Sequence, residues 1–389
     1  MINPGSYVFL AQDRVIFGKP ASEAVAEEAA RRKAQRIFIV ASKTLSRKTD
    51  VVTGIRAALG ERFAGLFDET REHVPRDSVL AAASAVRAVR PDLIVTVGGG
   101  TPMDTVKVML VCLAENITST ETLGDYYIRT KPDGTRDVKP VGSPPMRQII
   151  VPTTLSGAEF SNLGAAIDPL RKVKDLYTGR EIGADTVILD PAVTVHTPEW
   201  LWLSTGMRAV DHAVETICSK APQPFTDATC LYGLTMLAKS LRRNREAPND
   251  LDARLESQFG VWLATTGLGR VPWGASHGIG HQLGAVAGVP HGHCTCVMLP
   301  TVLRWNKSVN AAQQSSVARA LGAPDQDAAD AIAKLISDLG MPSRLRDVGV
   351  RREHFDAIAS GSLTNLFVTQ NPRPVKRRED VLEILEAAY

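Results

Sequence analysis

The sequence predicts an α/β domain over residues 1–192, followed by an all-helical domain over residues 193–389. Two observations lead to this fold class. In the first half, short β-branched apolar runs alternate with Ala- and Arg-rich helical segments, and after about Pro191 such runs almost vanish. At 389 residues the chain also exceeds the usual size of a single core, so two domains are expected.

The strands of the first domain are expected to be buried and parallel, because their apolar runs are nearly continuous. These strands lie in RIFIVASKTLS, LIVTVGGG, RQIIVPTT and TVILDP. The segment from Tyr126 to Pro145 is rich in Lys, Asp, Gly and Pro and is expected to form a loop. Helical periodicity then runs through LSTGMRAVDHAVETICSK, DATCLYGLTMLAKSLRRN and DAADAIAKLISDLG.

Composition points to a small-molecule partner. The formal net charge is +3, from 45 basic and 42 acidic residues, and no long single-sign run suggests nucleic-acid binding. The five cysteines include no CxxC pair, which suits reduced thiols. The N-terminus lacks a signal-peptide pattern, and no run of about 18 apolar residues predicts a membrane helix. A cytoplasmic protein is therefore expected.

A glycine turn follows the second predicted strand. Gly98, Gly99, Gly100 and Thr101 lead directly into a helix, so backbone N–H groups and the helix N-terminus could receive a phosphate. The alternative is a tight turn without a ligand. A second turn of small residues, PTTLSGAE, follows another strand, and two such turns at strand ends predict a bound nucleotide.

Four of the eight histidines lie in ASHGIGHQLGAVAGVPHGHC. His277 and His281 are four residues apart and share a helix face, His291 follows a Gly-Val-Pro break, and His212 lies on another predicted helix. Three roles remain open for these histidines: metal ligands, proton carriers or hydrogen-bonded core residues. His293 is expected to have only a structural role. HGIGH lacks the glutamate of HExxH, which argues against a metallopeptidase. Together with a nucleotide, the cluster suggests hydride transfer to a carbonyl.

The order and spacing of these motifs resemble the iron-containing alcohol dehydrogenase superfamily along nearly the whole chain. The motifs are GGGTPMDTVK, PTTLSGAEFSN, GMRAVDHAVE, SHGIGHQLGAVAGVPHG, LPTVLRWN and NPRPVKRREDVLEIL. The resemblance implies an α/β dinucleotide-binding domain and a helical C-terminal domain, the dehydroquinate synthase-like fold, and a homodimer. It also implies a nicotinamide coenzyme, NAD(P)H, and in many members a divalent metal, iron or zinc.

The same resemblance assigns roles to individual residues. The glycine turn and Asp104 would hold the pyrophosphate, and His281 would relay a proton near the nicotinamide. His212, His277 and His291 match the three histidine ligands of the metal. The remaining coenzyme contacts that it implies are Thr153, Thr154, Ser156 and Lys174.

The fourth metal ligand, an aspartate, belongs four residues before His212, where this chain has Arg208. The maleylacetate reductase branch also lacks this aspartate, and LPTVLRWN and NPRP are similar to that branch. We therefore expect an NAD(P)H-dependent reductase of a small carbonyl or oxo-acid substrate, with a maleylacetate-like acid as one candidate. The alternatives are a metal-dependent primary alcohol dehydrogenase and a non-redox sugar-phosphate lyase of related fold.

Two residues lead to more specific expectations. Arg208, one turn from His212, is expected to bind a substrate carboxylate and to disfavour a tightly held ion; alternatively it pairs with Asp211 or Glu215 and leaves a three-histidine metal site. Ser42 ends a strand where NAD-preferring relatives commonly have an aspartate. With the bases of KTLSRK nearby, NADPH is expected to be accepted at least as well as NADH, unless these bases form only a solvated face.

Overall fold

The computed structural model describes residues 6–130, 136–171 and 173–389. The chain divides into two compact units: residues 1–153 with 158–196, and residues 154–157 with 197–389. The predicted boundary after residue 192 lies close to this division. The sequence did not predict that residues 154–157, in the middle of the first half, pack with the second unit.

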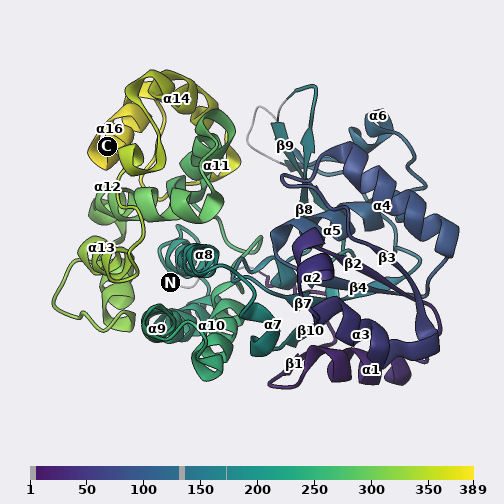
Figure 1. Ribbon diagram of the computed structural model, residues 1–389. Helices are drawn as coiled ribbons and strands as arrows, with labels where there is room; N and C mark the ends of the chain where they lie inside the picture. The colour runs from purple at the N-terminus through teal and green to yellow at the C-terminus, as the bar shows by residue number, and fades with distance from the viewer. Residues whose placement is uncertain (1–5, 131–135, 172) are drawn as a thin grey trace. The chain divides into compact units, whose positions relative to one another are not determined.

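The first unit is built on a six-stranded parallel sheet with the strand order β1-β10-β7-β4-β2-β3 (Figure 1). Its inner strands are the predicted apolar runs, and β2 and β4 are buried at every position. The strands of this sheet are β1 Arg14–Phe17, β2 Ile37–Ala41, β3 Phe63–Phe67, β4 Leu93–Gly98, β7 Arg147–Pro152 and β10 Ala184–Leu189.

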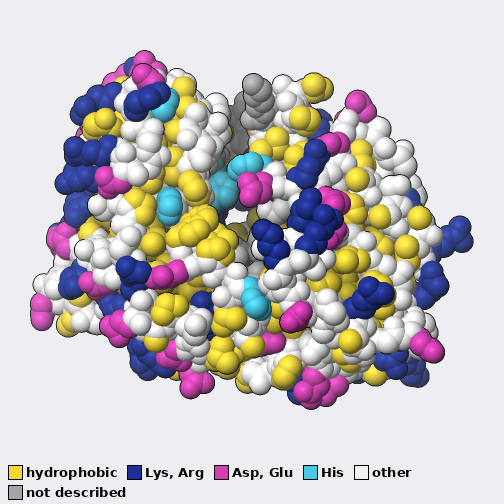
Figure 2. All heavy atoms as spheres, viewed as in Figure 1, with side chains coloured by type: hydrophobic (Ala, Val, Ile, Leu, Met, Phe, Trp, Pro, Cys, Tyr) yellow, Lys and Arg dark blue, Asp and Glu magenta, His cyan; other side chains and the backbone are white. Residues whose placement is uncertain are grey.

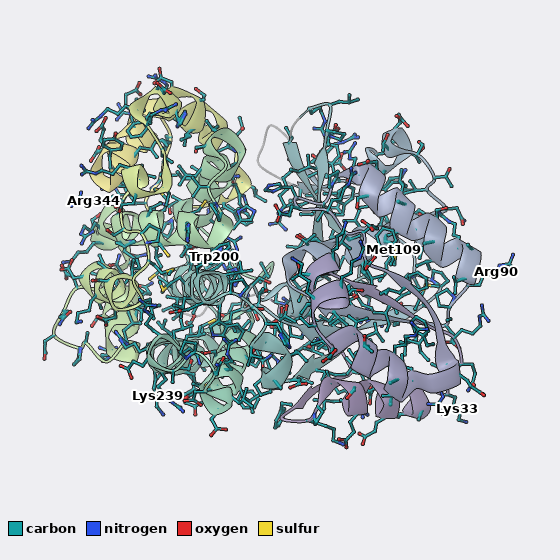
Figure 3. All side chains as sticks on the ribbon, in the orientation of Figure 1. Lys33, Arg90, Met109, Trp200, Lys239 and Arg344 are labelled. Carbon is teal, nitrogen blue, oxygen red and sulfur yellow. The ribbon has the colours of Figure 1, made fainter. Side chains whose placement is uncertain are left out.

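Both faces of the sheet are covered, because the side chains of a strand alternate between faces. Phe38 and Val40 of β2 pack in one core with α4 and α5, whereas Ile37 and Ile39 pack in a second core with α1 and α3. Met109 of α5, labelled in Figure 3, belongs to the first of these cores. The helices are α1 Ala21–Arg31, α2 Lys43–Lys48, α3 Val51–Leu59, α4 Arg76–Val89, α5 Gly100–Ala114, α6 Thr120–Leu123 and α7 Pro191–Thr194.

Four further strands form two antiparallel pairs outside this sheet. One pair joins β5 and β6, within the segment expected to be a loop, and the other joins β8 and β9. A short 3-10 helix, Ala158–Phe160, precedes β8. The bounds are β5 Arg129–Thr130, β6 Arg136–Asp137, β8 Leu163–Asp168 and β9 Val173–Thr178.

The second unit is helical throughout the residues described, as the sequence predicted. Helix α8 is buried along most of its length and packs against α9, α10, α11 and α12. Gly288 ends α11 in a left-handed conformation, and His291 begins α12. The helices are α8 Glu199–Ile217, α9 Pro224–Glu246, α10 Leu251–Ala264, α11 Ala275–Ala287, α12 His291–Ala320, α13 Ala328–Asp338, α14 Phe355–Leu363, α15 Leu366–Thr369 and α16 Arg378–Ala388.

The surface agrees with the balanced composition. Basic and acidic side chains both occur across the face seen in Figure 2. The five cysteines are all buried and form no disulfide. A search of the described helices finds none with the length and apolarity needed to cross a membrane.

Candidate active site

The glycine turn of the first unit joins β4 to α5. Gly98 has φ 144°, and a Cβ at this position would lie 2.6 Å from Cγ of Pro102, so only glycine fits without strain. Its carbonyl accepts a hydrogen bond from the N–H of Thr153 at 3.0 Å. Gly99 provides no side-chain cap to α5, and a Cβ on Gly100 would meet open space. The N-terminus of α5 thus has no side-chain cap, and phosphate binding there stays a prediction.

The other residues expected to contact a coenzyme fall in both units. Asp104 is half-buried in α5, and Lys174 is exposed on β9. Thr153 belongs to the first unit, whereas Thr154 and Ser156 belong to the second, where the Thr154 hydroxyl bonds to Oγ of Ser156 at 3.4 Å. The structure therefore joins Thr153 to the glycine turn, and coenzyme binding by these residues stays a prediction.

Ser42 is the N-cap of α2, and its Oγ accepts a hydrogen bond from the N–H of Leu45 at 3.4 Å. The bases beside it are not isolated positive charges. Arg47 forms ion pairs with Asp68, at 2.8 Å, and with Glu69, and Lys43 lies 3.4 Å from Glu69. These acids follow β3, the strand paired with β2. The surface beside Ser42 is therefore largely charge-balanced, which the sequence pattern did not reveal.

In the second unit, a buried acid–imidazole cluster joins α8 to α11. Nδ1 of His277 lies 2.7 Å from Oε2 of Glu215 and 3.4 Å from Oδ2 of Asp211. The hydroxyls of Ser276 and Thr295 both donate to Oδ2 of Asp211, at 2.9 and 3.0 Å. Asp211 and Glu215 are four residues apart on α8, so both carboxyl groups share one face of that helix.

The beginning of α11 is held by side chains that lie far away in the sequence. Glu215 accepts hydrogen bonds from the N–H groups of Gly274 and Ser276, at 3.0 and 2.9 Å. Asn371 accepts one from the N–H of Ala275 at 2.9 Å. The first N–H groups of a helix have no partner within it, so these side chains cap α11 and fix the start of the turn that carries His277.

His212 extends the cluster by stacking. Its ring lies 4.8 Å from that of Trp273 and 5.2 Å from that of His277, nearly parallel to both. The indole N–H of Trp273 donates to Oγ1 of Thr216 at 3.0 Å. Nδ1 of His212 and Nε2 of His277 are buried and have no hydrogen-bond partner among the residues described. Two imidazole nitrogens are thus left available to a ligand.

His281 and His291 form a second pair, with ring centroids 6.1 Å apart. Both rings are half-buried. Phe367 lies beside both pairs, 5.4 Å from the ring of His281 and 6.3 Å from that of His277. His293 lies apart from these contacts, and its ring is 5.9 Å from that of Trp200 on α8, labelled in Figure 3.

Burial dominates the electrostatics of the acid–imidazole cluster. Burial raises the pKa of Asp211 to about 6 and that of Glu215 to about 7. Burial, with a smaller contribution from the positive charge of Arg208, also lowers the pKa of His277 to about 4 and that of His212 well below 6.5. Both imidazoles are therefore neutral near pH 7, which keeps a lone pair on each ring.

The potential metal ligands that lie together in the structure differ from the three histidines that were expected from the sequence. Within the described chain, only Asp211, Glu215 and His277 form a set of three potential ligands whose donor atoms lie within 4.8 Å of one another. The three histidines expected as ligands do not form such a set. From the sequence, Asp211 and Glu215 were expected as possible partners of Arg208, and Asp211 was set aside as a metal ligand because it lies about 100° round the helix from His212. Their spacing of four residues on a helix, around His212, was the signal that could have found them.

Comparison with known proteins identifies the chain. The model of iron-containing alcohol dehydrogenase matches residues 12–191, and that of the C-terminal part of the Fe-containing alcohol dehydrogenase family matches residues 202–389. Dehydrogenase ALT3 of Alternaria alternata is 33% identical, over 91% of this chain and 98% of that protein. Maleylacetate reductase of Pseudomonas sp. strain P51 is 27% identical, over 97% and 95%. The solved maleylacetate reductase of Rhizobium sp. strain MTP-10005 has a TM-score of 0.82 at 26% identity, covering 100% and 99%.

These matches confirm the resemblance and the fold class that the sequence predicted. The chain belongs to the iron-containing alcohol dehydrogenase family and is an oxidoreductase.

Proposed function

We propose that this oxidoreductase uses NADH or NADPH to reduce the carbonyl group of a small anionic substrate, such as an oxo acid. The observation that carries the proposal is the pair of neutral, buried imidazoles with unpartnered nitrogens, at His212 and His277, beside the fixed positive charge of Arg208. The names of the maleylacetate reductase relatives, which concern an oxo acid, support the substrate class.

The glycine turn supports the coenzyme half of this proposal. Gly98 lets the backbone turn sharply into α5, and the helix N-terminus would attract the pyrophosphate of a dinucleotide. Thr101 in the first turn of α5 and Thr153 beside Gly98 would contribute hydroxyl groups. Bound there, the coenzyme would supply the hydride.

Arg208 is the residue that we propose to recognise the anion. It is half-buried on α8, and its charge acts on Asp211, Glu215 and both imidazoles of the cluster. A guanidinium carries five N–H donors, so it can bind a substrate carboxylate in a bidentate manner while it keeps a protein partner. With Arg208 binding a carboxylate, the enzyme would prefer acidic substrates to neutral aldehydes.

The helical unit also offers imidazole nitrogens to a divalent cation, although among the described residues His212, His277 and His291 do not gather within 4.8 Å of one another. Nδ1 of His212 and Nε2 of His277 are neutral donors of the kind that zinc and iron prefer, and His291, at the start of α12, would be a further donor. A bound cation would polarise the carbonyl of the substrate.

From the sequence, the charge of Arg208 was expected to disfavour a tightly held ion unless Arg208 paired with Asp211, Glu215 or another acid. The structure adds two acids to the same site. Oδ2 of Asp211 lies 3.4 Å from Nδ1 of His277, and Glu215 bonds directly to the same nitrogen. We propose that the imidazole donors hold a metal despite the positive charge of Arg208, with these two acids beside them.

His281 is proposed to pass a proton to the reduced oxygen of the substrate. It lies one turn after His277 on α11 and is half-buried, so proton exchange with solvent is open to it. The amide of Asn365 lies 3.4 Å from its Nδ1 and would orient the ring. An imidazole suits this role because it titrates near neutral pH.

The absorbance of the reduced coenzyme tests the function. Purified protein is mixed with NADH or NADPH and with matched pairs of carbonyl compounds, each an oxo acid and the neutral aldehyde of the same length. Oxidation of the coenzyme, faster with the acids, is the expected result. Turnover of a sugar phosphate without net change of coenzyme would instead identify a lyase, and a preference for neutral primary alcohols and aldehydes would identify an alcohol dehydrogenase.

A further inference from the structure

Glu215 holds three groups at the beginning of α11 with one side chain. Oε1 accepts the N–H of Ser276 at 2.9 Å, and Oε2 accepts the N–H of Gly274 at 3.0 Å while lying 2.7 Å from Nδ1 of His277. The side chain is only 6% exposed. A Cβ on Gly274 would lie 2.6 Å from Oδ1 of Asn371 and 3.0 Å from Oε1 of Glu215. The carboxyl group therefore has one well-defined position.

These contacts determine which nitrogen of His277 carries the proton. Both oxygens of Glu215 already accept backbone N–H groups, which favours a carboxylate that also accepts the Nδ1 proton of His277. Oδ2 of Asp211, 3.4 Å from the same Nδ1, adds negative charge on that side. In a neutral imidazole protonated at Nδ1, the lone pair lies on Nε2, the buried atom that has no hydrogen-bond partner in the described chain.

We propose that Glu215 is a positioning residue that fixes His277 as the Nδ1–H tautomer and thereby presents the Nε2 lone pair to a cation or a substrate. Replacing a carboxylate that orients a metal-binding imidazole in this way typically lowers metal affinity or activity about 10- to 100-fold. Binding of a cation or substrate by the Nε2 lone pair rests on the proposed function. The identity of the tautomer is argued from the hydrogen bonds of Glu215 and not from that function.

Asn371 offers a matched control. Its Oδ1 accepts the N–H of Ala275, between the two N–H groups held by Glu215, and its Nδ2 donates to Oδ1 of Asn306 at 2.7 Å. Replacing Asn371 therefore disturbs the same cap of α11 through the backbone and Asn306. If Glu215 served only as a cap, the two substitutions would have similar effects.

The tautomer can be measured in the full-length, metal-free protein labelled with ¹⁵N-histidine, because NMR separates protonated from unprotonated ring nitrogens. Loss of a signal in His277→Gln assigns that residue. We expect protonated Nδ1 and unprotonated Nε2 in the unaltered protein and in Asn371→Ser, and a shift towards the Nε2–H form in Glu215→Gln. Calorimetry with zinc alone should show affinity about 10- to 100-fold weaker in Glu215→Gln and unchanged in Asn371→Ser.

A proton on Nε2 of His277 in the unaltered protein would overturn the proposal, and this measurement needs no variant to fold. An unchanged tautomer in Glu215→Gln, or an equal loss of zinc affinity in Asn371→Ser, would reduce Glu215 to a helix cap. Failure of the proposed function would give a different result from failure of this proposal. The tautomers would be those expected, but no carbonyl compound would oxidise the coenzyme.

Discussion

Arg208 lies four residues before His212 on α8, and its positive charge contributes to the low pKa of that imidazole. The position is one turn of helix away, where the family resemblance implies an aspartate. The chain thus has a positively charged arginine where the resemblance implies a negatively charged, metal-binding aspartate. Two acids farther along the same helix, Asp211 and Glu215, lie beside His277, and burial raises their pKa values to about 6 and about 7.

The first prediction concerns substrate charge. Arg208→Ala should raise KM for oxo acids about 10- to 100-fold, because hydrogen bonds to charged groups are worth about 1.5–3 kcal/mol. KM for a neutral aldehyde of the same length should change little. Steady-state kinetics check this, with Arg304→Ala as control, since Arg304 pairs with Asp330 on the surface. An equal rise in KM for the oxo acid and for the aldehyde would mean that Arg208 does not bind the substrate carboxylate.

The second prediction concerns the metal. Protein purified without chelator should contain about one zinc or iron per chain, and His212→Gln and His277→Gln should each lower this content, because they remove the unpartnered imidazole nitrogens. His293→Gln serves as control, since its ring packs beside Trp200 instead. Elemental analysis measures the content. Substoichiometric metal with activity that survives chelation would restore the view that Arg208 excludes an ion.

The sequence could predict what local patterns determine. Continuous apolar runs predicted the parallel strands, and the glycine run predicted a tight turn between strand and helix, whereas the φ of 144° at Gly98 is known only from the structure. The link between Glu215 and His277 spans 62 positions, and that between Asn371 and Ala275 spans 96. Such contacts depend on how α8, α11 and the C-terminal segment pack, which helical periodicity does not specify.

The third prediction concerns proton transfer. His281→Ala should lower kcat by about 10² to 10⁴ while leaving the dissociation constant of the coenzyme nearly unchanged, because general acid catalysis contributes in this range. Pre-steady-state kinetics and coenzyme fluorescence titration measure the two quantities. Asn365→Ala, which removes the amide near Nδ1, should cause a smaller loss of kcat. A kcat close to that of the parent in His281→Ala would assign the proton to another group.

The fourth prediction concerns the choice of coenzyme. Arg47 is engaged by Asp68 and Glu69, so a 2′-phosphate near Ser42 would have to compete with two carboxylates for the guanidinium. Asp68→Asn should therefore raise kcat/KM for NADPH relative to NADH, and Ser42→Asp should lower the same ratio. Paired measurements with both coenzymes check this. A ratio unaffected by either change would place the adenosine ribose elsewhere.

The last prediction concerns a buried acid in the first unit. Glu159 is 2% exposed, its Oε2 has no hydrogen-bond partner among the described residues, and burial raises its pKa to about 7, opposed in part by Lys107. The folded protein thus holds a proton that the unfolded chain releases near pH 4.5. The stability that Glu159 contributes is complete below that pH and is lost as pH rises through about 7.

Glu159→Gln keeps the shape of the side chain and does not titrate. The free energy of unfolding of this variant relative to the parent should therefore increase between pH 5 and pH 8, by at most about 1.4 kcal/mol per pH unit. The variant also removes the charge that raises the pKa of Lys107, so the difference reports on the two coupled groups together. Urea unfolding at a series of pH values measures the effect. A difference that stays constant, or that falls with rising pH, would show that Glu159 is ionised in the folded protein throughout this range.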